Sequence, residues 1–82
     1  MVISVEISMY PFREEYIPPI KAYIEKLNSY QGLSVKTFPT STVIMGDYDL
    51  VMTVIKESIQ WSYQQYGKAV FVTKIIPAYE AL

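Results

Sequence analysis

The chain has 82 residues, of which 51% are hydrophobic, and its formal net charge is −1. It contains neither cysteine nor histidine, which excludes thiolate nucleophiles, imidazole bases, disulfides and the zinc sites built from these residues. The seven basic residues are scattered along the chain, which argues against nucleic-acid binding. We expect one domain over residues 1–82, without cofactor or metal, whose surplus apolar surface is covered by another copy of the chain.

The N-terminal segment VISVEISMY, residues 2–10, has the alternation of a strand that is buried on one side. Its apolar face carries Ile3, Val5, Ile7 and Met9, and its other face carries Ser4, Glu6, Ser8 and Tyr10. Pro11 ends the strand. The segment lacks the basic flank and long apolar run of a signal peptide, and no part of the chain has the ~20 apolar residues of a membrane span. We therefore expect a cytoplasmic protein.

The next segment predicts a helix that begins near Ile17 and continues toward Tyr30. Two consecutive prolines, Pro18 and Pro19, are compatible with a helix only in its first turn. Gly32 follows as the left-handed residue that caps the helix. Apolar residues recur at three- and four-residue spacing, at Ile17, Ile20, Ile24 and Leu27.

Two short strands follow and predict a hairpin. The runs LSVKTF (33–38) and STVIM (41–45) are rich in β-branched or aromatic residues and are separated only by Pro39 and Thr40. The sequence GDYD (46–49) then introduces a second helix. Either of its aspartates, Asp47 or Asp49, is suited to accept hydrogen bonds from the free N–H groups at the helix start.

The second predicted helix extends from Leu50 to about Tyr66 and ends at Gly67. Apolar residues occupy more than half of its circumference, which is wider than the stripe that one sheet face needs. Trp61 and Tyr63 lie at the borders of this arc and are the expected outward contacts. Ser58 and Ser62 lie near its middle, one turn apart. We favour close packing, with each hydroxyl bonding back to a carbonyl one turn earlier, over a polar patch in a pocket.

The final segment KAVFVTKII, residues 68–76, predicts a strand that Pro77 ends. The order strand, helix, strand, strand, helix, strand is typical of the ferredoxin-like α+β fold. In this βαββαβ fold a four-stranded antiparallel sheet carries both helices on one face. The first and third strands lie side by side in its centre, and the opposite face is open to solvent, a ligand or a partner.

Polar groups near the sheet suggest a ligand site. Glu6 lies mid-strand on the face away from the helices, where it is either solvated or paired with a partner such as an aminopyrimidine, whose ring nitrogen and amine match a carboxyl group. Thr40, Ser41 and Thr42 cluster where the chain enters a central strand and could reach the same face as Glu6. Strand alternation separates Thr42 from Val43 without deciding which of them faces the helices.

No catalytic set is apparent. Glu14 with Glu15, and Asp47 with Asp49, are carboxylate pairs, but both pairs lie at predicted helix starts, where the helix dipole favours acidic residues. We therefore predict that the protein is not an enzyme. A ferredoxin-like monooxygenase is an alternative that would have to work without histidine, and RNA binding is disfavoured because Tyr10 is the only aromatic residue on its strand face.

The segments VEISMYPF, YIPPIKAYIEKL, LSVKTFPTSTVIMGDYD and AVFVTKI together resemble the YkoF-like thiamine/hydroxymethylpyrimidine-binding family over nearly the whole chain. The most specific part is the stretch from Pro39 to Asp47. The resemblance implies a ferredoxin-like domain that pairs its sheet with other copies, as a homodimer or a tetramer, and binds thiamine or its pyrimidine moiety. The ligand contacts that the resemblance implies are Glu6, Ser8, Tyr10, Thr40, Ser41 and Thr42.

From these observations we predict a small-molecule-binding protein for thiamine or hydroxymethylpyrimidine that acts without chemical turnover, as a carrier or in salvage. Tyr10 and Trp61 could stack on the heterocycle, while the hydroxyls and Glu6 would bind its edge. The alternative is a structural or regulatory oligomeric subunit without a small-molecule ligand. The site could lie between the helices and the sheet or between subunits.

Overall fold

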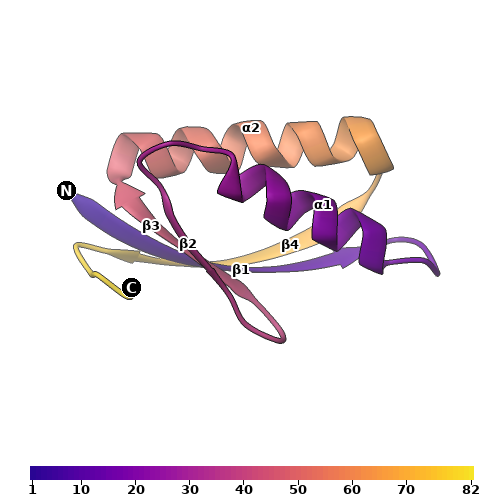
Figure 1. Cartoon of the computed structure of the whole chain (residues 1–82), viewed down its shortest axis with the longest axis horizontal. Coiled ribbons are helices and arrows are strands. Elements are labelled where there is room, and N and C mark those ends of the chain that lie inside the picture. The colour runs from indigo at the N-terminus through magenta and orange to yellow at the C-terminus, as the bar shows by residue number, and fades with distance from the viewer.

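The computed structural model describes all 82 residues, Met1–Leu82. Its elements are, in order, β1 (Val2–Pro11), α1 (Ile17–Asn28), β2 (Ser34–Thr37), β3 (Thr42–Asp47), α2 (Tyr48–Tyr66) and β4 (Ala69–Pro77). The strands form one sheet in the order β2-β3-β1-β4, and every neighbouring pair is antiparallel. Both helices cover the same face of this sheet (Figure 1). The predicted ferredoxin-like α+β fold, with β1 and β3 at its centre, is confirmed.

The core lies between this sheet face and the helices. The alternation of β1 buries one side of the strand, as predicted, because the helices cover only that side. Full burial of an aliphatic side chain contributes roughly 1.5–3 kcal/mol, so this cluster provides most of the driving force for folding. Its eight members are Ile3, Val5, Ile7, Tyr23, Leu27, Ile44, Val51 and Val54.

Helix α1 begins at Ile17 as predicted, with prolines in its first turn. It ends at Asn28, two residues before Tyr30, because Ser29 takes the C-cap position and its hydroxyl donates a 2.6 Å hydrogen bond to the carbonyl of Lys26. Gly32 has the expected left-handed conformation, with φ of 79°. It lies in the turn that follows the helix, so the prediction that it caps α1 was wrong.

Helix α2 begins at Tyr48, two residues before the predicted Leu50, because β3 extends through Asp47 and leads directly into the helix. Asp47 occupies the N-cap position but forms no side-chain cap hydrogen bond. Its carboxylate lies 3.6 Å from the N-terminal amine of Met1 instead. Gly67 ends α2 as predicted, and its N–H donates a 2.8 Å hydrogen bond to the carbonyl of Tyr63.

The predictions for the apolar arc of α2, which concerned its outward contacts and its two serines, are correct in part. Tyr63 points outward as expected and is 61% exposed. Trp61 is half-buried beside α1, with the Nζ of Lys26 5.6 Å from its ring centroid, so it is not an outward contact. Ser58 is buried and its hydroxyl donates back to the carbonyl of Ile55, as predicted. Ser62 is also buried, but its hydroxyl has no hydrogen-bond partner.

The residues after β4 fold back over the sheet face that lies away from the helices (Figure 1). Ala78 turns the chain with φ of 55°. The Ser4 hydroxyl then donates a 2.6 Å hydrogen bond to the carbonyl of Tyr79 and accepts one of 2.9 Å from the N–H of Ala81. Ser4 is therefore buried although it lies on the polar face of β1. Neither helix is long and apolar enough to cross a membrane.

Candidate ligand-binding cavity

A difference in strand length creates an unpaired edge in the centre of the sheet. The pairing of β1 with β3 ends where Ile7 lies opposite Thr42. On the other side of β1, pairing with β4 continues to Pro11 opposite Ala69. Residues 8–11 of β1 therefore have a strand partner on one side only. Backbone N–H and C=O groups on such an edge are free to bind another molecule.

A cavity of about 560 Å³ lies beside this edge. The residues 7–11 of β1 form one wall, the hairpin residues 37–42 form another, and α1 contributes Ile20, Tyr23 and Ile24. Arg13 and Tyr16, from the loop between β1 and α1, complete the lining. The volume falls within the range of about 300–1,000 Å³ that is typical of small-molecule sites.

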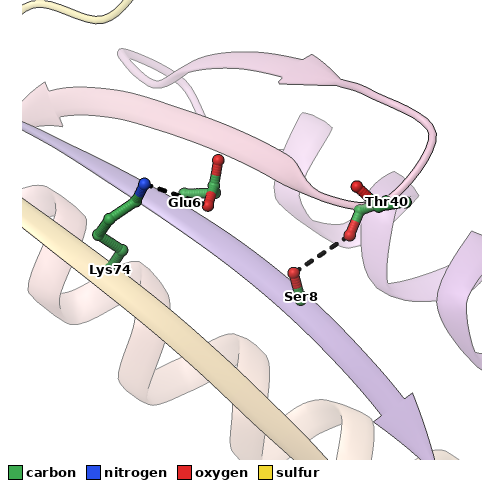
Figure 2. A network of polar contacts seen from close by, with 4 residues as sticks. All are labelled: Glu6, Ser8, Thr40 and Lys74. Carbon is green, nitrogen blue, oxygen red and sulfur yellow. Dashed lines mark hydrogen bonds and ion pairs between the residues drawn. The ribbon is translucent and has the colours of Figure 1, made fainter.

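Five of the six residues predicted to contact a ligand line this cavity: Ser8, Tyr10, Thr40, Ser41 and Thr42. Ser8 donates a 3.1 Å hydrogen bond to the carbonyl of Thr40, which fixes the hairpin loop against β1 (Figure 2). Thr42 is buried on the helix side of the sheet, and its hydroxyl lies 3.3 Å from that of Thr37. It therefore does not share a face with Glu6, as had been considered possible.

Glu6, the sixth predicted residue, is not part of the cavity lining. It lies directly opposite Lys74 on β4, and its carboxylate is 3.6 Å from the Lys74 ammonium (Figure 2). Both side chains are partly exposed on the sheet face away from the helices. Glu6 therefore shares a strand face with Ser8 and Tyr10 but does not line the cavity, whose wall contains no carboxylate.

The rear wall of the cavity is fixed by a buried hydrogen-bond pair between the helices. The ring of Tyr23 lines the cavity, and its hydroxyl lies 2.9 Å from that of Ser58 on α2. Burial raises the pKa of Tyr23 above its ordinary value, so the phenol is neutral at physiological pH. The ring also packs against Phe71 of β4, with 5.0 Å between the ring centroids. Tyr23 thereby joins both helices and the sheet at this wall.

Comparison with known proteins identifies the family. The sequence profile of a family described as thiamine-binding protein matches residues 5–76. The chain belongs to this thiamine-binding family. Comparison with curated protein sequences gave no match.

Solved structures share the fold of this thiamine-binding family protein. A protein from Streptococcus pneumoniae is 22% identical, with a TM-score of 0.87 over 96% of this chain and 89% of its own. A candidate thiamine biosynthesis/salvage protein from Thermotoga maritima is 25% identical, with a TM-score of 0.84 over 99% of this chain and 86% of its own. A hypothetical protein from the genus Methanocaldococcus is 24% identical, with a TM-score of 0.80 over 99% and 84%.

Several lining residues of this thiamine-binding family member were not recognised from the sequence. Ile20 and Ile24 were predicted only as part of the apolar face of the first helix, and both are half-buried and line the cavity. Their exposure follows from the short β3, whose pairing with β1 ends at Thr42 and leaves the space beside residues 20–24 of α1 unfilled. The sequence did predict a first strand of nine residues beside a third strand of only five, and this difference in length indicated that part of the first strand would lack a partner. Arg13, Tyr16 and Phe38 lie in loops, where no periodicity indicates the direction of a side chain.

Proposed function

We propose that the protein binds thiamine or its hydroxymethylpyrimidine moiety in this cavity without chemical turnover, as a carrier or in salvage. The main support is the cavity itself, which contains five of the six residues expected to contact such a ligand. Membership of the thiamine-binding family supports the same ligand class.

The lining suits an aminopyrimidine in shape and hydrogen bonding. Tyr10, Tyr16 and Phe38 provide aromatic faces for stacking. In an aminopyrimidine the ring nitrogen accepts a hydrogen bond and the neighbouring amine donates one. On the unpaired edge of β1 a backbone N–H can donate to that nitrogen and a backbone C=O can accept from that amine. This edge takes the role that the sequence had suggested for the Glu6 carboxylate. The hydroxyls of Thr40 and Ser41 provide further hydrogen bonds.

Isothermal titration of thiamine and hydroxymethylpyrimidine into the purified protein tests the proposal. We expect micromolar or tighter binding of at least one compound, at about one ligand per chain. Ile24→Trp adds bulk to the α1 wall of the cavity and should weaken this binding, with circular dichroism confirming that the variant is folded. Glu6→Gln is the control, because Glu6 does not line the cavity, and it should leave affinity unchanged. Binding that is unaffected by Ile24→Trp and is lost in Glu6→Gln would contradict the cavity as the site.

We also propose that the protein assembles into a homodimer or a tetramer through the open sheet face. Val70 and Val72 of β4 are 43% and 55% exposed there. Val43 and Met45 of β3 lie on the same face, on the other side of β1, as the strand register requires. Exposed apolar side chains on an open sheet face are typical of protein interfaces, and here they flank the polar side chains Ser4, Glu6 and Ser8 of β1.

Light scattering tests the assembly, and Val72→Asp should convert the oligomer to a monomer. Because the cavity lies within one chain, this variant should retain ligand binding. A wild-type monomer would contradict the proposed assembly. A stable oligomer that gives no heat with either compound would instead favour the alternative, a structural or regulatory subunit without a small-molecule ligand.

A further inference from the structure

The cavity has one charged residue in its lining, and that residue is a cation. Arg13 is the single member of the Lys, Arg, Asp and Glu group among the 16 lining residues. The other polar side chains of the wall are hydroxyls, which donate hydrogen bonds without adding charge. The ion pairs of the structure join Met1 to Asp47 and Lys74 to Glu6, so Arg13 is not neutralised by a paired carboxylate.

Arg13 is held at the cavity by the end of α2. Its guanidinium carbon lies 5.6 Å from the ring centroid of Tyr66, within the range of a cation–π contact. Glu14 and Glu15 follow in the same loop, but both are exposed to solvent and neither lines the cavity. Arg13 is itself exposed to solvent, so its attraction for an anionic group should weaken as the salt concentration rises.

We propose that Arg13 binds an anionic group on the ligand, so that the site prefers a phosphate monoester of thiamine or hydroxymethylpyrimidine to the unphosphorylated compound. This inference rests on the proposed function of the cavity. The heterocycle lies against the aromatic wall, and the phosphate extends to Arg13. A guanidinium binds phosphate through two parallel hydrogen bonds, a geometry that lysine lacks. Unphosphorylated thiamine carries a positive ring, which an unpaired arginine repels.

The test compares each compound with its own phosphate monoester by isothermal titration. In the wild type, thiamine monophosphate should bind about tenfold more tightly than thiamine, and the same should hold for hydroxymethylpyrimidine phosphate and hydroxymethylpyrimidine. Arg13→Gln should remove this preference, so that each compound and its phosphate monoester bind with similar affinity. Arg13→Lys should retain part of it, because the charge remains and the two-point geometry is lost.

Lys21→Gln is the matched control for the loss of one positive charge. Lys21 is exposed on α1 and does not line the cavity, so the preference for the phosphate monoester should persist in this variant. Equal wild-type affinities for the paired compounds, or an equal effect of Lys21→Gln and Arg13→Gln, would overturn the role of Arg13 while the proposed function stands. Absence of binding by all four compounds would overturn the proposed function and this inference together.

Discussion

The hydrogen bond between Tyr23 and Ser58 predicts that removing one hydroxyl lowers the stability of the protein more than removing the other. Tyr23 is 3% exposed and Ser58 is fully buried, so water does not replace a missing partner. Ser58→Ala leaves the Tyr23 hydroxyl buried and unpaired, which should lower the free energy of unfolding by about 1–3 kcal/mol. Tyr23→Phe should cost only about 0.5–1.5 kcal/mol, because Ser58 keeps its 3.3 Å bond to the carbonyl of Ile55.

Urea denaturation followed by circular dichroism measures these differences. The double variant should cost less than the sum of the single ones, because no hydroxyl is then left unpaired at this position. Tyr63→Phe is the matched control, since Tyr63 is exposed, and it should change stability by less than about 0.5 kcal/mol. Equal costs for Tyr23→Phe and Ser58→Ala, or additive costs in the double variant, would refute the reasoning. Tyr23→Phe keeps the ring in the cavity wall and should leave ligand affinity unchanged.

Three further predictions concern stability at high pH, backbone conformation and the open sheet face. Burial raises the pKa of Tyr23 above 10.0 in the folded state, so the unfolded chain ionises first and the free energy of unfolding should fall as the pH rises above that value. In Tyr23→Phe this fall with pH should be shallower. An unchanged slope in the variant would contradict the prediction. Gly67→Ala should lower the free energy of unfolding by about 1–3 kcal/mol in urea denaturation, because Gly67 has φ of 83° and alanine is strained in that conformation. A methyl group there would meet no atom within 4 Å, so backbone strain is the only cost. Glu6→Gln should change stability by less than about 1 kcal/mol, because its ion pair with Lys74 is exposed, and a larger loss would indicate a buried partner.

The fold was predictable because each element carries its own local signal. The alternation of β1 and the prolines in the first turn of α1 are examples, and Gly67 ends α2 where the sequence indicated. Errors at the other helix ends arose from competition between neighbours. Ser29 ends α1 before Gly32 can cap it, and the carboxylate of Asp47, at the N-cap position of α2, lies beside the N-terminal amine of Met1 instead of forming a cap hydrogen bond.

The site was predictable only in part because it depends on where strands stop pairing. Hydroxyls near Thr40 were recognised from their clustering, but their position relative to Glu6 depends on which side of β3 faces the helices. That choice is settled by the register of β3 against β1, which a single sequence does not specify. The return of the chain over Ser4 was missed for a related reason, because backbone groups of Tyr79 and Ala81 form these bonds and carry no side-chain signal.

Mapping of amide chemical shifts during titration with thiamine or hydroxymethylpyrimidine tests the central claim most directly, because it reports binding and its location in one measurement. We predict that the shifts concentrate on residues 8–10 of β1, the hairpin residues 37–42 and residues 20–24 of α1. Shifts confined to the other sheet face, around Glu6 and Lys74, or the absence of shifts with either compound, would contradict the assignment of this cavity as the binding site.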